Sequence, residues 1–203
     1  MSALTNMQGF WRNFLQKDAT IRQALINQDT KTLESIMDQL DDKAVQITGA
    51  HIFLEYAYDN FELTFDTGPN KTSQYLAQLC VDLAPKEIKE NWILNASLPP
   101  LSQKAVQSSV QMKDQTYTLQ DFYAFYQEDE DNQMFNVQIY CPGYALIGNP
   151  ERKKEMSMYV VELAIGLLAY ESYMGSIDFI DQPNQEMAFC SLIDFYEVVM
   201  DTV

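Results

Sequence analysis

Apolar and polar residues alternate most regularly in the second quarter of the chain. Every second residue of the segment 60–66 is apolar, which is the period of a half-buried strand. The apolar stretch 52–58 predicts a partner strand, and Asp59-Asn60 suits the tight turn between the two. The pattern changes to helical spacing over 71–84 and returns to alternation over 92–98. This region therefore predicts a hairpin, a helix and a third strand.

Helical spacing dominates on both sides of this region. Residues 8–27 predict an amphipathic helix that bends near Asp18, and the Asp29-Thr30 step can begin a second helix. The longest predicted helix begins at Asn149-Pro150, because proline fits the first helical turn, and ends at Gly175.

The other elements are shorter. Alternation predicts strands at 135–141 and 176–181, and helical spacing predicts a terminal helix at 191–199. The polar stretch 101–118 predicts one or two weak strands exposed at an edge, and the aromatic stretch 119–126 suits either a strand or a short helix.

Together these elements predict a single α+β domain covering residues 1–203. Its sheet is expected to be mostly antiparallel with helices packed on one face, because hairpin-like neighbours outnumber helical crossovers. Within this domain, a helical pair at 8–42 precedes a sheet-and-helix core at 51–199.

The charge of the chain narrows the classes of partner. Its 29 acidic and 13 basic side chains give a net charge of −16, which repels nucleic acid and anionic membrane surfaces. A basic protein would be attracted and steered toward such a surface. The alternative is that the acidity serves solubility alone.

Several features predict a cytoplasmic protein. The segment 1–10 lacks the basic and apolar regions of a signal peptide, and the longest apolar run, 160–169, is far shorter than a membrane span. The three cysteines, Cys80, Cys141 and Cys190, are widely separated, as expected of reduced and buried thiols.

Candidate chemistry is sparse. His51 is the only histidine and has no nucleophile beside it in the sequence, so we expect a structural role. Cys141 lacks a neighbouring positive charge that would activate it. No zinc spacing and no glycine-rich phosphate loop occurs, so neither a metal nor another cofactor is predicted. Glu171, at the end of an apolar helix, is the candidate for a carboxylate-lined pocket, and Glu162 lies on the polar stripe of that helix.

An aromatic cluster that runs directly into an acidic segment is the strongest surface candidate. Tyrosine rings supply contact area and carboxylates steer a partner, so this stretch predicts a protein contact site, although alternate members must face the core. The predicted partner-binding residues are Phe122, Tyr123, Tyr126, Glu128, Asp129, Glu130 and Asp131.

The order of elements resembles that of a group of uncharacterised bacterial cytoplasmic proteins, some of them encoded near toxin–immunity loci. The residues that carry the resemblance are Phe10-Trp11, the hairpin 51–66, Ala84-Pro85, the proline-closed strand 92–100 and the segments 167–181 and 191–199. The resemblance implies a non-enzymatic, immunity-like role, and it carries no catalytic residue across.

The leading hypothesis is a non-catalytic acidic module that binds another protein, in an immunity-type or adaptor role. The alternative is a small hydrolase or ligand-binding protein with a carboxylate-lined pocket near Glu171. A third hypothesis is a homo-oligomeric subunit that self-associates through the polar strands at 101–118.

Overall fold

The computed structural model describes residues 3–202, and the predicted α+β class is confirmed. The chain forms two compact units, and the boundary between them falls at the Leu98-Pro99 step. The sequence, in contrast, predicts a single domain over residues 1–203. The predicted helical pair does not stand apart from the sheets, because it packs on the first sheet and shares an apolar core with it.

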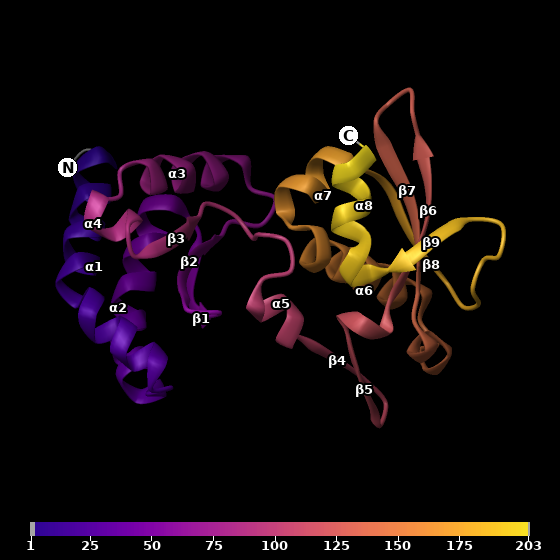
Figure 1. Cartoon of the computed structure of the whole chain (residues 1–203), viewed down its shortest axis with the longest axis horizontal. Helices are drawn as coiled ribbons and strands as arrows, with labels where there is room; N and C mark the ends of the chain where they lie inside the picture. The colour runs from indigo at the N-terminus through magenta and orange to yellow at the C-terminus, as the bar shows by residue number, and fades with distance from the viewer. Residues whose placement is uncertain (1–2, 203) are drawn as a thin grey trace. The chain divides into compact units, whose positions relative to one another are not determined.

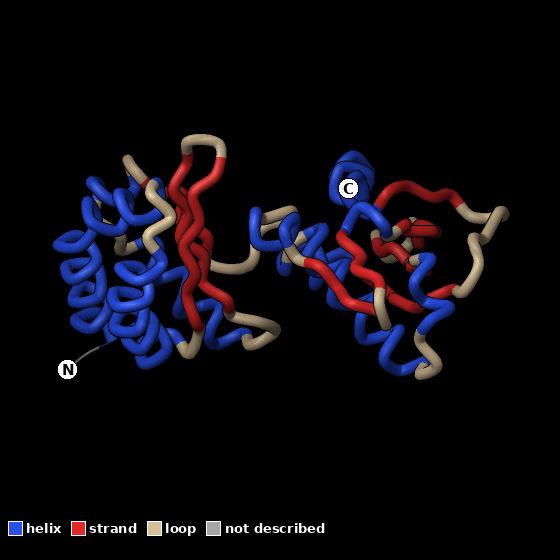
Figure 2. The backbone as a smooth tube through the Cα atoms, turned by 90° about the horizontal axis from the view of Figure 1, so that it is seen from below, coloured by secondary structure: helices blue, strands red, loops and turns tan. Residues whose placement is uncertain are grey.

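The first unit places its two N-terminal helices on one side of a three-stranded sheet (Figures 1 and 2). Its strands are ordered β1-β2-β3, with β1 and β2 antiparallel and β2 and β3 parallel. The crossover between β2 and β3 contains two helices, of which the second was not predicted. The elements are α1 (Ala3–Ile26), α2 (Thr30–Thr48), β1 (His51–Ala57), β2 (Asn60–Asp66), α3 (Lys71–Asp82), α4 (Lys86–Lys89) and β3 (Trp92–Asn95).

Local signals explain where these helices begin and end. Asp29 caps α2 by accepting from the backbone N–H of Thr32, and Asn70 caps α3 in the same way. Gly49 ends α2 with a left-handed φ of 75°, which glycine adopts without steric cost. Helix α1 continues through Asp18, where the sequence predicts a bend.

The core of the first unit is aromatic. Phe10, Trp11 and Phe14 of α1 are fully buried, and their rings pack against one another. Phe10 also packs on Phe65 of β2, and Phe14 packs edge-on against Trp92 of β3 with ring centroids 5.2 Å apart. Burial of this apolar surface is the main force that holds α1 on the sheet.

The second unit contains a four-stranded sheet ordered β8-β7-β6-β9 and a separate two-stranded sheet formed by β4 and β5. In the four-stranded sheet, β7 and β8 are parallel and the other pairs are antiparallel. The helices are α5 (Gln103–Gln107), α6 (Pro150–Ile165), α7 (Leu167–Tyr173) and α8 (Phe195–Thr202), with 3₁₀ turns at Leu119–Asp121, Pro142–Leu146 and Leu192–Asp194. The strands are β4 (Ser109–Met112), β5 (Gln115–Thr118), β6 (Tyr123–Asp129), β7 (Met134–Tyr140), β8 (Met174–Ile180) and β9 (Ala188–Ser191).

Two predictions in this unit need correction. The single long helix is divided at Gly166, whose φ of 77° and ψ of 158° are not helical, so α6 ends one residue earlier and α7 begins one residue later. Strand β9 was not predicted, because its four residues are too short to show alternation. The weak strands expected within 101–118 exist as the hairpin of β4 and β5.

The two faces of the four-stranded sheet differ in what covers them. Phe135, Val137 and Ile139 of β7 are buried on the face that α6, α7 and α8 cover (Figure 1). The segment 181–187 connects β8 to β9 across the other face, and Asn184 donates to the side chain of Gln138 there. We call this second surface the open face.

Candidate functional site

The predicted contact segment is divided between the two faces of the sheet. Phe122 is fully buried and packs edge-on against Tyr144, with ring centroids 6.0 Å apart. Tyr126 is half-buried and packs against Phe135 and Phe195 under the helices. The prediction that Phe122 contacts a partner is therefore wrong, and most of the Tyr126 ring belongs to the core. Side chains alternate across a strand, so neighbours in the sequence cannot all share one surface.

The open face keeps the remaining aromatic side chains. Tyr123 is exposed there beside Tyr140, with ring centroids 6.4 Å apart. Phe189 of β9 lies opposite Phe125 of β6, and the two rings stack with centroids 5.3 Å apart. Phe125 is buried by this stacking, whereas Phe189 is 62% exposed.

Phe189 is an exposed aromatic residue that the sequence did not indicate as a candidate. Single exposed apolar side chains are normal on protein surfaces, but Phe189 stacks on Phe125 and shares its face with Tyr123 and Tyr140, so several aromatic rings gather there. The only signal of Phe189 in the sequence is a phenylalanine two residues before the predicted terminal helix. Its position on the open face follows from pairing with β6, which the sequence does not specify.

The acidic residues lie at the tip of the hairpin formed by β6 and β7 (Figure 1). Asp129 accepts from the backbone N–H and the side-chain amide of Asn132, at 3.2 and 2.8 Å, which holds the turn. Glu128, Glu130 and Asp131 are exposed, and none of them forms an ion pair in the part of the chain that the structure describes. We call these four residues the acidic tip.

The charge of the chain is concentrated in the second unit. Residues 99–203 contain 16 acidic and 5 basic side chains, whereas residues 1–98 contain 13 and 8. One of the five cations, Lys153, is buried, forms an ion pair with Asp181 and lies 5.1 Å from the centre of the Phe179 ring. Lys153 therefore contributes little to the outward field of this unit.

The other candidate residues are divided between the two units. Glu171 is half-buried and lines neither of the two cavities described below. His51 is exposed, and its Nδ1 lies 2.7 Å from the carboxylate of Asp41, whose hydrogen bond and charge raise the pKa of the imidazole. Burial raises the pKa of the thiols of Cys80 and Cys190 to about 12.

Burial likewise raises the pKa of the Cys141 thiol to about 11, so the reactive thiolate is scarce near neutral pH. Within residues 3–202 no three histidine, cysteine or carboxylate side chains gather as a metal site would require. No helix in that range is long and apolar enough to cross a membrane.

Each unit contains a surface cavity. A cavity of about 90 Å³ in the second unit is lined by Tyr117, Phe122 and Tyr159 among others, and it is too small for most ligands. An open bowl of about 320 Å³ in the first unit is lined by residues 59–61 of the β1–β2 hairpin and 89–93 of the α4–β3 turn.

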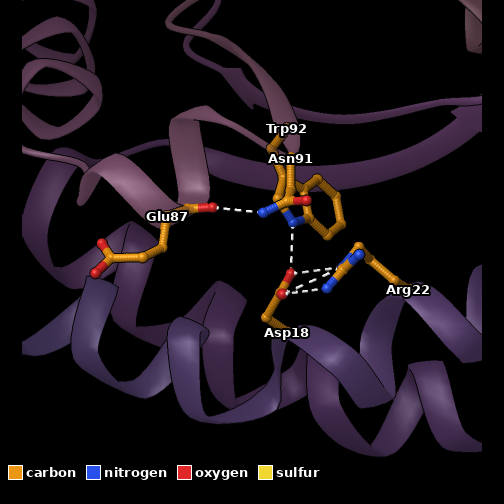
Figure 3. A network of polar contacts seen from close by, with 5 residues as sticks. All are labelled: Asp18, Arg22, Glu87, Asn91 and Trp92. Carbon is orange, nitrogen blue, oxygen red and sulfur yellow. Dashed lines mark hydrogen bonds and ion pairs between the residues drawn. The ribbon is translucent and has the colours of Figure 1, made fainter.

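Polar contacts, of which the bond between Trp92 and Asp18 is buried, hold the wall of this bowl. The indole N–H of Trp92 donates to the carboxylate of Asp18 at 2.6 Å, and the same carboxylate binds Arg22 at 2.9 Å (Figure 3). The Asn91 side chain donates to the backbone carbonyl of Glu87 at 2.7 Å.

Comparison with known proteins does not narrow the possible functions of the chain. No protein-family model, curated protein or solved structure matches this chain. The resemblance to immunity-like bacterial proteins therefore stays a prediction, and the proposals below depend on the geometry of the chain itself.

Proposed function

We propose that this protein is a non-catalytic module that binds a basic segment of another protein on the open face of its second unit. The observation that carries this proposal is Phe189, which is 62% exposed and stacked on Phe125 in a unit with a large acidic excess. An exposed aromatic ring beside carboxylates suits lysine and arginine side chains, through apolar contact, cation–π attraction and ion pairing.

The carboxylates lie around the aromatic surface of the open face. Asp178 of β8 is exposed on this face because it lies opposite Gln138, and Glu186 is exposed in the crossing segment 181–187. The acidic tip extends the negative charge beyond the aromatic pair. Charges of one sign in this arrangement raise the association rate of a cationic partner, whereas the aromatic rings slow its dissociation.

The test is a pull-down from native cell lysate with the full chain immobilised, followed by elution with a salt gradient. We expect a basic protein that elutes at moderate salt, because exposed ion pairs are screened. Phe189→Ala should reduce its capture by raising the dissociation rate. A tip variant that combines Glu128→Gln, Glu130→Gln and Asp131→Asn should slow association about tenfold, and its dissociation rate should change little.

A matched control removes the same charge from another surface. Glu34, Asp38 and Asp42 are exposed on α2, and changing them to Gln, Asn and Asn should leave capture unchanged. Capture that is equally strong for the wild type, the tip variant and Phe189→Ala would refute the proposal. In the immunity-type version of the proposal the captured protein is a toxin, and adding the chain should inhibit the activity of that toxin in vitro.

A further inference from the structure

The tip of the β1–β2 hairpin carries a side chain that neither its conformation nor its packing explains. Tyr58 and Asp59 form a two-residue loop with Ala57 opposite Asn60, and their φ angles are 49° and 63°. Such loops favour asparagine and glycine, because both central residues must be left-handed. Tyr58 is 97% exposed, so its ring gains nothing by burial in the chain itself.

The bowl described above begins at the residue next to this tyrosine. Asn60 and Asn91 supply amide groups to its lining, whereas Phe61 is half-buried and Trp92 is 4% exposed, so little aromatic carbon is accessible there. The accessible lining is therefore mostly polar, and it offers hydrogen-bond partners to the hydroxyl group of a protruding tyrosine.

The bowl is also lined by side chains of opposite charge. Lys89 lines the bowl, and its ammonium group is held by one hydrogen bond, 2.8 Å long, to the Asp82 carbonyl, which leaves other donors available. Asp59 also lines the bowl, and one of its oxygens accepts from the Tyr56 hydroxyl at 3.0 Å. An anion and a cation therefore lie within one patch.

We propose that two copies of the chain associate through this patch, with Tyr58 of each copy inserted into the bowl of the other and Asp59 of each copy paired with Lys89 of the other. A two-fold interface requires a self-complementary surface, and this patch holds a projection, a hollow and both signs of charge. The contact is small relative to the roughly 1,200 Å² buried in stable interfaces, so the dimer is weak and concentration-dependent. The site lies in the first unit and is independent of the binding function proposed for the open face.

Sedimentation velocity of the full chain from about 1 to 100 µM tests the proposal, since weak interfaces have dissociation constants in the micromolar range. We expect a monomer–dimer equilibrium for the wild type. Tyr58→Asn should raise the dissociation constant at least about tenfold, as loss of a central aromatic contact does. Asparagine tolerates the left-handed conformation, so the urea midpoint of this variant should not fall.

Tyr75→Asn is the matched control, because Tyr75 is also largely exposed in the first unit, on α3, and its loss should leave the equilibrium unchanged. The charge reversals Asp59→Lys and Lys89→Asp should each weaken the dimer, and together they should restore it. A wild type that stays monomeric throughout, a Tyr58→Asn variant that dimerises like the wild type, or a double reversal as weak as the single ones would overturn the proposal.

Discussion

The carboxylate of Asp18 ties β3 to α1, and its removal should destabilise the first unit strongly. It accepts the indole N–H of Trp92 at 2.6 Å and binds Arg22 at 2.9 Å (Figure 3). Asp18 and Trp92 are 8% and 4% exposed, so water cannot replace the lost acceptor easily. Asp18→Ala leaves the indole donor buried without a partner and the guanidinium of Arg22 without its anion.

The magnitude follows from these contacts. A hydrogen bond to a charged group contributes about 1.5–3 kcal/mol, and removal of one partner from a fully buried ion pair costs about 3–5 kcal/mol. The side chain of Arg22 is about a third exposed, so water solvates it partly after the mutation and the upper figure does not apply. We expect Asp18→Ala to lower the free energy of unfolding by about 2–4 kcal/mol.

The assay is urea unfolding followed by tryptophan fluorescence. Both tryptophans, Trp11 and Trp92, lie in the first unit, so their signal reports the unfolding of that unit. Asp18→Asn keeps an oxygen that can accept from the indole and loses only the charge, so its cost should be roughly half as large. The slope of the free energy with urea should stay constant, because the surface exposed on unfolding is the same.

A surface ion pair provides the control. Lys86 of α4 and Glu90, the C-cap residue of that helix, lie 3.3 Å apart and are both largely exposed. Lys86→Ala should change stability by no more than about 0.5 kcal/mol. If Asp18→Ala costs no more than Lys86→Ala, the buried carboxylate does not hold β3 on α1 and the reasoning fails.

Two further predictions concern packing and pH. A Cβ atom at Gly143 would lie 2.6 Å from the Tyr117 ring, so Gly143→Ala should lower the free energy of unfolding by about 1–3 kcal/mol. Gly148→Ala is the control, because no atom lies within 4 Å of a Cβ atom at that position. Equal melting temperatures of the two variants would contradict the prediction. The pKa of His51 is raised in the folded state by Asp41, so the pair stabilises the fold below the unfolded pKa near 6.5, and this stabilisation is lost as the pH rises through the folded pKa. The destabilisation caused by His51→Gln should therefore appear in mild acid and vanish in mild base, and an NMR titration midpoint of the single histidine at or below 6.5 would show that Asp41 does not act on it.

Elements with strong local signals could be predicted from the sequence. The hairpin of β1 and β2 follows from its alternation, and Asp29 and Asn70 begin helices because their side chains satisfy free backbone N–H groups. Gly166 could not be recognised as a helix break, because glycine inside an apolar helical pattern is often tolerated and its φ is set by the surrounding packing.

The candidate site was predictable only in part. The acidic tip follows from composition, since four consecutive carboxylates cannot be buried. The faces on which Phe122 and Tyr126 lie depend on the register of β6 against β7 and β9, and a shift of one residue would exchange those faces.

The sequence by itself determined the α+β class, the acidic character and most of the secondary structure, because these depend on local periodicity and on composition. Tertiary structure alone decided which aromatic residues are exposed. Phe189 reaches the open face because β9 pairs with β6, and the bowl beside Tyr58 forms because β3 returns parallel to β2. Both features join segments distant in the chain, and such pairings depend on which faces can be buried together rather than on any local preference.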